Sequence, residues 1–201
     1  MKTHAVVLCL CCAVALIQSE PPKAELLKPG SDAPTFSLPS LSGNREELRV
    51  WCGEDLKKPY INDTKHTVII SFWATWCKPC MKEIPQLVSF MNEHEGEPIK
   101  LFCVSIDEGG ASKVRPFIEK RGWNITVLLD PYRRTAERYG LIPPGTRLIS
   151  VPALFVVGPE GKIRYSAGGF ADTTDLAAKL NGVLERIASG EEAVGGEVEV
   201  A

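Results

Sequence analysis

Uncharged runs rich in β-branched and aromatic residues alternate with segments of helical periodicity through the middle of the chain. The run TVIISFWA at 67–74 carries no charge, which is typical of a strand buried on both faces of a parallel sheet. Residues 77–94 follow with apolar side chains at helical spacing: Met81, Ile84, Leu87, Val88 and Met91. The alternation continues as strands over 99–107 and 125–130 and as helices over 111–121 and 132–139. This order predicts βαβ units.

The pattern changes after Gly140. Two strand-like runs in ALFVVGPEGKIRYSAGG are joined by the sequence GPEG at 158–161, which has the length and chemistry of a hairpin turn. These runs add antiparallel strands to the sheet. Apolar positions at helical spacing over 172–188 predict a closing helix. We therefore predict an α/β domain with a central mixed sheet flanked by helices.

The pattern is less regular upstream of the first buried strand. The segment GSDAPTFSLPSLSG at 30–43 alternates apolar and polar residues between prolines, which suits a short edge strand or hairpin. We expect an N-terminal strand extension at this place. Residues 44–66 are polar and irregular, and we interpret them as an insertion with a short helix over 46–50.

The two ends of the chain differ in composition from its middle. Lys2 precedes an apolar run over 5–17, which is the layout of a secretory signal, and the run is shorter than the roughly 20 residues that span a bilayer. We expect a cleaved signal peptide rather than a permanent anchor, and hence export to the bacterial periplasm or the extracytoplasmic face of the membrane. The expected segments are the signal peptide (1–19), a linker (20–29), one folded domain (30–190) and a flexible acidic tail (191–201).

Composition indicates a globular domain without a nucleic-acid-binding patch. The chain has 201 residues, of which 44% are hydrophobic and 24% are charged, and its net charge is −2. Lysines and arginines are scattered, so no interaction with nucleic acid is expected. Of seven cysteines, removal of the leader would leave four in an oxidising compartment, namely Cys52, Cys77, Cys80 and Cys103.

The stretch FWATWCKPCMKEIP at 72–85 contains two cysteines separated by two residues. Such a pair can bind zinc, form a structural disulfide or exchange electrons. A structural zinc site takes four ligands, usually two such pairs or one pair with two nearby histidines, and only one pair is present. A structural bridge between Cys77 and Cys80 closes so short a loop that it stabilises the fold very little. We expect no metal site.

The position of the pair at the expected start of a helix favours redox chemistry. Unpaired backbone N–H groups and the positive end of the helix dipole favour a thiolate on Cys77. Cys80 lies on the same face one turn later, close enough to attack a mixed disulfide formed by Cys77. Pro79 suits the first turn, where no N–H is needed. Trp76 is expected to form an exposed apolar rim for docking, with burial in the core as the alternative.

The other two cysteines are interpreted more simply. Cys103 lies in the apolar run over 99–107 and is most simply a buried small hydrophobe. Cys52 lies in the insertion. A bridge between Cys52 and Cys103 is an open alternative, which requires loop and strand to approach within disulfide reach.

Three motifs occur in this order within residues 30–163, and they read GSDAPTFSLPSLSG, FWATWCKPCMKEIP and SVPALFVVGPEGKI. Together they resemble the TlpA/ResA branch of exported thioredoxin-like thiol–disulfide oxidoreductases, and the similarity spans roughly residues 30–187. The resemblance implies a thioredoxin fold in which Cys77 is the exposed nucleophile and Cys80 the buried resolving thiol. It also makes Val151 and Pro152 the family's cis-proline element, which lies beside the cysteines and pairs with a substrate segment. An ordinary trans proline that opens a strand is the alternative.

Glu83 matches an acidic residue that ResA-like members place near the active site. By this resemblance a partly buried carboxylate could accept or donate protons and tune the thiol pKa values, and a solvated helix residue is the alternative. Ser71 departs from the general thioredoxin pattern, which has a buried aspartate at that place in the strand. Because a serine cannot accept the proton of Cys80, that task would fall to Glu83 or to water.

These features predict a thiol–disulfide oxidoreductase that needs no bound cofactor. By resemblance it is a reductase of protein disulfides, as in cytochrome c maturation, with protein thiol or disulfide clients and re-reduction by a membrane electron donor. We expect a monomer. Two other functions stay open. One is a thiol peroxidase of the peroxiredoxin group, which shares the APTFSLPSL-like opening but has a Thr-x-x-Cys context that is missing here, and the other is a non-catalytic thioredoxin-fold binding module.

Overall fold

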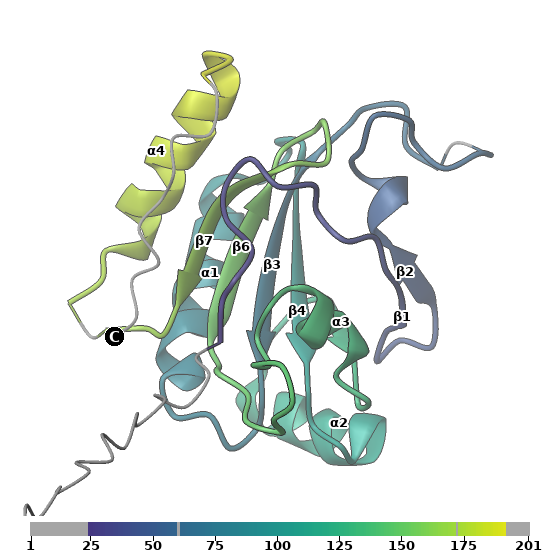
Figure 1. Ribbon diagram of the computed structural model, residues 1–201, viewed down its shortest axis with the longest axis vertical. Helices are drawn as coiled ribbons and strands as arrows, with labels where there is room; N and C mark the ends of the chain where they lie inside the picture. The colour runs from purple at the N-terminus through teal and green to yellow at the C-terminus, as the bar shows by residue number, and fades with distance from the viewer. Residues whose placement is uncertain (1–23, 60, 172, 192–201) are drawn as a thin grey trace, which may run out of the picture.

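The computed structural model describes residues 24–59, 61–171 and 173–191, and these residues contain a central five-stranded sheet (Figure 1). Its strands are β3 (Thr67–Trp73), β4 (Ile99–Ser105), β5 (Val127–Leu129), β6 (Ala153–Val157) and β7 (Ile163–Gly168). Their order across the sheet is β5-β4-β3-β6-β7. β3, β4 and β5 run parallel, whereas β6 is antiparallel to both of its neighbours. The mixed sheet expected from the sequence is confirmed.

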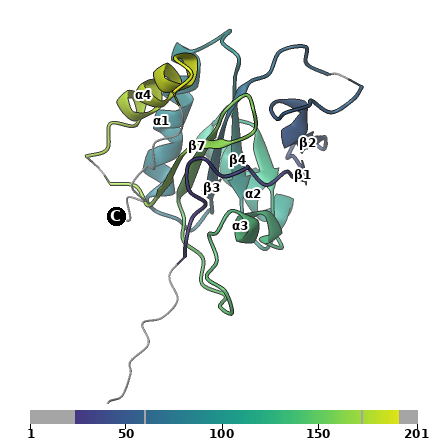
Figure 2. The ribbon, with the colours of Figure 1, turned by 45° about the horizontal axis from the view of Figure 1, so that its top comes forward.

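Helices cover both faces of this sheet. α1 (Cys80–Glu93) and α2 (Gly110–Arg121) lie on one face and α3 (Arg134–Arg138) on the other, while α4 (Leu176–Ala188) packs beside α1 (Figures 1 and 2). α1 and α2 each connect two parallel neighbouring strands, which is the βαβ arrangement that the alternating pattern predicted.

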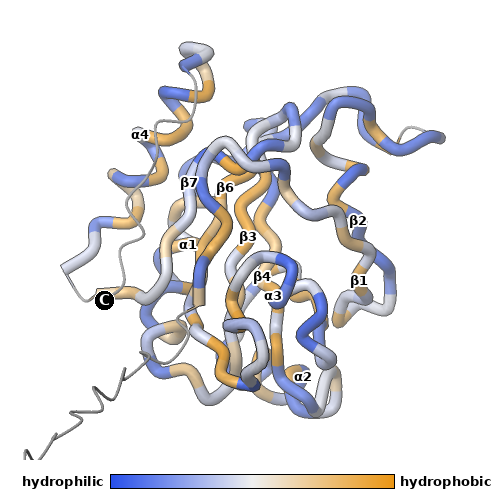
Figure 3. The backbone as a smooth tube through the Cα atoms, viewed as in Figure 1, coloured by the Kyte–Doolittle hydropathy of each residue, from blue (hydrophilic) through white to orange (hydrophobic). Residues whose placement is uncertain are grey.

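β3 lies at the centre of the hydrophobic core. All of its residues are buried, because β4 and β6 flank it within the sheet and other elements cover its two faces. Figure 3 shows hydrophobic positions following the central strands and polar positions following the outer loops. The uncharged run at 67–74 therefore occupies the central place that its composition predicted.

A small second sheet forms the N-terminal strand extension. β1 (Ser37–Pro39) pairs antiparallel with β2 (Arg45–Glu47), as expected of a hairpin. The short helix expected over 46–50 is only partly correct, because residues 45–47 pair with β1 and a single 3-10 turn, η1 (Leu48–Val50), follows them. The other described residues of the insertion are irregular, as expected. The described part of the insertion still contributes three buried side chains to the domain, those of Leu48, Cys52 and Leu56.

Three helices begin later than the sequence suggested, namely α1, α3 and α4. α1 starts at Cys80 rather than at Cys77, because the residues between β3 and Cys80 form a turn. α4 starts at Leu176, since Asp175 caps it: the Asp175 carboxylate accepts a hydrogen bond from the Ala178 N–H at 3.0 Å. The capping hydrogen bond thus defines the start of α4 more precisely than the spacing of apolar residues did.

The expected signal peptide (1–19) and the acidic tail beyond Glu191 lie outside the described residues. Residues 24–29, which belong to the expected linker, include the buried side chain of Leu26. The N–H of Leu27 donates to the carbonyl of Tyr139 at 3.3 Å. Among the described residues, none of the helices combines the length and the apolar character that a membrane crossing requires.

Candidate active site

A disulfide bond between Cys77 and Cys80 lies at the junction of β3 and α1. The two sulfur atoms are 2.03 Å apart and the two Cα atoms 5.4 Å apart. Cys80 is the first residue of α1, and its backbone N–H donates to the Sγ atom of Cys77 at 3.2 Å. A donor at a helix N-terminus stabilises negative charge on sulfur, so this contact favours a thiolate on Cys77 once the bond is reduced.

The resemblance implied an exposed Cys77 and a buried Cys80. In the bonded state Cys80 is fully buried, but Cys77 is also only 3% exposed, so the exposed nucleophile is wrong for this state. The exposed side chain at this place is Trp76, with 52% of its surface accessible, whereas Trp73 is fully buried. Pro79 occupies the N-cap position of α1 with a φ of −65°, where a missing N–H costs nothing. Trp76 therefore presents the apolar surface beside the disulfide.

The peptide bond between Val151 and Pro152 is cis, so the alternative of a trans proline is wrong. The next residue, Ala153, pairs with Phe72 in the antiparallel register of β6 and β3. Phe72 is close to the end of β3, from which the chain turns toward Cys77. The register therefore brings Pro152 to the same edge of the sheet as the disulfide.

Glu83 is buried in α1 and is 1% exposed, so the alternative of a solvated helix residue is wrong. The hydroxyl of Ser71 in β3 donates to its Oε1 atom at 2.7 Å. Burial raises the pKa of Glu83 to about 7, and the hydrogen bond from Ser71 opposes part of that rise. Glu83 also lines a cavity of about 250 Å³ whose other walls come from β6, β7, residues that follow β7 and the start of α4. A carboxyl group with this pKa can take up and release a proton near neutral pH.

Cys52 and Cys103 are both free and buried, and no bridge joins them. Cys103 lies in β4, where it pairs in register with Ser71 as a small core residue. Burial, together with the charge of Glu160, raises the pKa of Cys52 to about 12. Both thiols therefore differ from the redox pair in being protonated core groups. The described part of the chain brings no three His, Cys, Asp or Glu side chains together as metal ligands.

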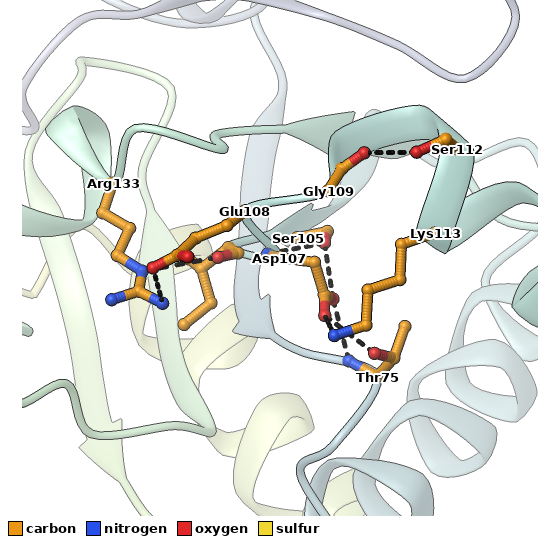
Figure 4. Close-up of polar contacts among 9 residues, drawn as sticks. Thr75, Ser105, Asp107, Glu108, Gly109, Ser112, Lys113 and Arg133 are labelled. Atoms are coloured by element: carbon orange, nitrogen blue, oxygen red, sulfur yellow. Dashed lines mark hydrogen bonds and ion pairs between the residues drawn. The ribbon is translucent and has the colours of Figure 1, made fainter.

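Asp107 contacts the turn that carries the cysteine pair, and the sequence analysis missed it (Figure 4). Its Oδ2 accepts a hydrogen bond from the Thr75 N–H at 2.8 Å, and its Oδ1 accepts one from the Thr75 hydroxyl at 2.7 Å. Thr75 precedes Cys77 by two residues. A signal was available, because Asp107 follows β4 as Cys77 follows β3, and the carboxyl ends of parallel neighbours meet at one edge of a sheet.

The chain is similar to known proteins in both sequence and fold. Thiol-disulfide oxidoreductase ResA of Bacillus subtilis (strain 168) is 32% identical over 139 residues, which cover 69% of this chain and 66% of that relative. Thiol-disulfide oxidoreductase ResA of Bacillus thuringiensis subsp. konkukian (strain 97-27) is 28% identical over 160 residues, which cover 79% of this chain and 81% of that relative. The crystal structure of StoA from Bacillus subtilis matches with a TM-score of 0.55 at 22% identity, over 76% of this chain and 97% of that one, and supports the fold alone.

The sheet order, the helices and the bonded cysteine pair define a thiol–disulfide oxidoreductase of thioredoxin fold. The chain belongs to the AhpC/TSA family, whose sequence profile matches residues 29–166.

Proposed function

We propose that this protein is an exported reductase of protein disulfides, of the kind used in cytochrome c maturation, and that it works through Cys77 and Cys80. The observation that carries the proposal is the disulfide at the start of α1, with the Cys80 N–H directed at the Cys77 sulfur. The names of the curated relatives support the same chemistry.

The reaction transfers two electrons from the reduced pair to a client disulfide. The Cys77 thiolate attacks one client sulfur, which forms a mixed disulfide and releases the other client sulfur as a thiolate that takes up a proton. Cys80 then loses its proton and attacks the Cys77 sulfur, which breaks the mixed disulfide. The products are the client dithiol and the Cys77–Cys80 disulfide, the state in which the pair is found here. A membrane electron donor would restore the reduced pair.

Glu83 is the proposed proton carrier for Cys80. Its buried carboxyl group has a pKa of about 7, which suits a group that must both accept and return a proton near neutral pH. Ser71 stands where general thioredoxins have an aspartate, and its hydroxyl donates to Glu83 instead of accepting a proton. In this proposal the Glu83 carboxyl group in α1 takes the place of the aspartate that β3 lacks.

The client segment is proposed to bind beside the disulfide. The exposed ring of Trp76 offers an apolar contact, and Pro79 and the backbone of Val151 and Pro152 border the same edge of the sheet. Backbone pairing with an extended segment is sequence-tolerant, so it suits a protein that must accept a disulfide in an unfolded client. We propose that the protein does this as a monomer.

Export and the direction of electron flow rest on the sequence. The charged residue and apolar run within 1–19 support a cleaved signal peptide, followed by the folded domain over 30–190. The resemblance to the TlpA/ResA branch supports reduction of clients over oxidation.

A redox titration joined to client trapping tests this function. We expect the Cys77–Cys80 midpoint potential to lie nearer the roughly −270 mV of thioredoxin than the roughly −120 mV of DsbA. Cys80→Ala cannot resolve a mixed disulfide, so the variant expressed in cells should retain exported client proteins that thiol reagents release, and Cys77→Ala should retain none.

Three results would oppose the proposal. An oxidising potential would reverse the proposed direction, and trapping of only cytosolic proteins would contradict export. Consumption of hydrogen peroxide by the purified protein with a thiol donor, without reduction of protein disulfides, would identify a peroxidase instead.

A further inference from the structure

We propose that Asp107 is a positioning residue that fixes the turn carrying Cys77 (Figure 4), an inference that rests on the proposed function. Both oxygens of its carboxylate accept hydrogen bonds from Thr75: Oδ2 from the N–H at 2.8 Å and Oδ1 from the hydroxyl at 2.7 Å. The side chain of Asp107 is fully buried. A buried carboxylate that binds one residue through both its main chain and its side chain restricts the position and the orientation of that residue.

Asp107 is itself held by two regular elements. Ser105 at the end of β4 donates its hydroxyl to Oδ2 at 3.0 Å and accepts the Asp107 N–H at 3.2 Å. Lys113 in α2 forms an ion pair with Oδ1, with 3.1 Å between the Nζ and oxygen atoms. The carboxylate is thus anchored to the sheet and to a helix, which is the support that a precise site requires.

Thr75 transmits this restraint to the reacting sulfur. It lies inside a turn closed by the Cys77 N–H, which donates to the carbonyl of Ala74 at 3.1 Å. The same turn sets the place of the Cys77 Sγ atom, 3.2 Å from the Cys80 nitrogen. If Thr75 is released, the turn can move and the thiolate of Cys77 loses part of its contact with that N–H group.

Substituting Thr75 tests the positioning role of Asp107 without changing any charge at the site. Thr75→Val keeps the shape and the charge but removes the hydroxyl donor, so we expect the pKa of the Cys77 thiol to rise. At pH 6–7 the attack of the reduced pair on 5,5′-dithiobis(2-nitrobenzoic acid) should slow about tenfold, the size of effect typical for a hydrogen bond to a charged group. Thr75→Ser retains the hydroxyl and should stay within about twofold of the wild type. Iodoacetamide alkylation across pH 4–9 reports the thiol pKa directly.

A double-mutant cycle tests whether Asp107 acts through Thr75. Asp107→Asn replaces one acceptor by a donor, and we expect it to slow the same reaction about tenfold. If the two residues act as one unit, combining Asp107→Asn with Thr75→Val adds less than about threefold to either loss. Glu108→Gln is the matched control, because it makes the same change of charge at the next residue, whose carboxylate pairs with Arg133 at 3.0 Å.

Several outcomes would overturn the inference. They are an unchanged Cys77 pKa and rate in Thr75→Val, losses that multiply in the double variant, or an equal loss in Glu108→Gln. If Asp107→Asn does not fold by circular dichroism, the Thr75→Val and Thr75→Ser pair decides the question alone. Wild-type protein that reacts with the small disulfide but reduces no protein disulfide would contradict the proposed function and leave this test intact.

Discussion

Burial gives Glu83 a pKa near neutrality and ties the stability of the protein to pH. The pKa rises from 4.5 to about 7 in the folded state, so the folded protein binds this proton more tightly than the unfolded chain does. The stabilising contribution is complete below pH 4.5 and is lost as the pH rises through 7. A shift of this size corresponds to on the order of 3 kcal/mol.

We therefore predict that Glu83→Gln removes this pH dependence. Gln stays neutral and can still accept the hydrogen bond from Ser71, so the variant should gain stability over the wild type between pH 4.5 and 7.5. Urea unfolding of the oxidised protein across this range measures the difference. Glu93→Gln, at the exposed end of the same helix, is the control and should parallel the wild type. Parallel curves for Glu83→Gln and the wild type would contradict the buried, proton-binding carboxyl group.

The site residues differ in how far apart they lie in the sequence, and therefore in how readily the sequence predicts that they meet. Cys77, Cys80 and Glu83 lie within one short segment, so spacing and resemblance were enough to place them together. The contact between Asp107 and Thr75 joins two segments 32 residues apart in the chain. Predicting it requires two separate signals to be combined, namely the βαβ order that places β4 beside β3 and the polar residue that follows each strand.

At the scale of elements, apolar patterns predicted which segments become strands and helices, and local hydrogen bonds set where they begin. Over 132–139 the helical pattern is longer than α3, which spans only Arg134–Arg138. Asp130 explains part of this difference, because its carboxylate accepts the Ala136 N–H at 2.9 Å and fixes the start of the helix. Burial raises the pKa of Asp130, and backbone N–H groups of α3 oppose the rise.

The cap of α4 allows a prediction at this scale. Asp175→Ala removes the acceptor for the Ala178 N–H, and we expect the free energy of unfolding to fall by about 1 kcal/mol at pH 7. Asp175→Asn keeps a capping oxygen and should lose much less. Denaturant unfolding of the three proteins measures the effect. Equal losses in both variants would attribute it to the charge at the helix N-terminus rather than to the cap.

At the scale of the whole molecule, segments far from the cysteine pair complete the domain. Leu26 lies next to Leu27 in an otherwise polar, proline-bearing segment, and a single pair of leucines has no periodicity that could predict the burial of Leu26. The structure shows it packed over Gly168 of β7, with its backbone against Gly140 after α3. The insertion at 44–66 is a similar case, because isolated apolar residues in a polar stretch can be buried only once the sheet has formed.

Substitution of Gly140 tests how residues 24–29 pack on the domain. Its φ of 82° favours glycine, and an added Cβ would overlap the backbone carbonyl of Glu25. Gly145 has a similar φ of 75° with no atom within 4 Å of such a Cβ, so it is a matched control. We expect Gly145→Ala to cost about 1 kcal/mol of strain. Gly140→Ala should cost roughly 2 kcal/mol more, because it displaces the segment and exposes Leu26.

Two measurements on these variants separate strain from displacement. Urea unfolding gives the difference in stability, and a glutamyl endopeptidase should cleave Gly140→Ala after Glu25 under native conditions, because the released segment becomes accessible. Gly145→Ala and the wild type should resist cleavage at that bond. Equal stability of the two glycine variants with no cleavage after Glu25 would show that residues 24–29 contribute nothing to the folded domain, whereas the expected pair of results would make them part of it.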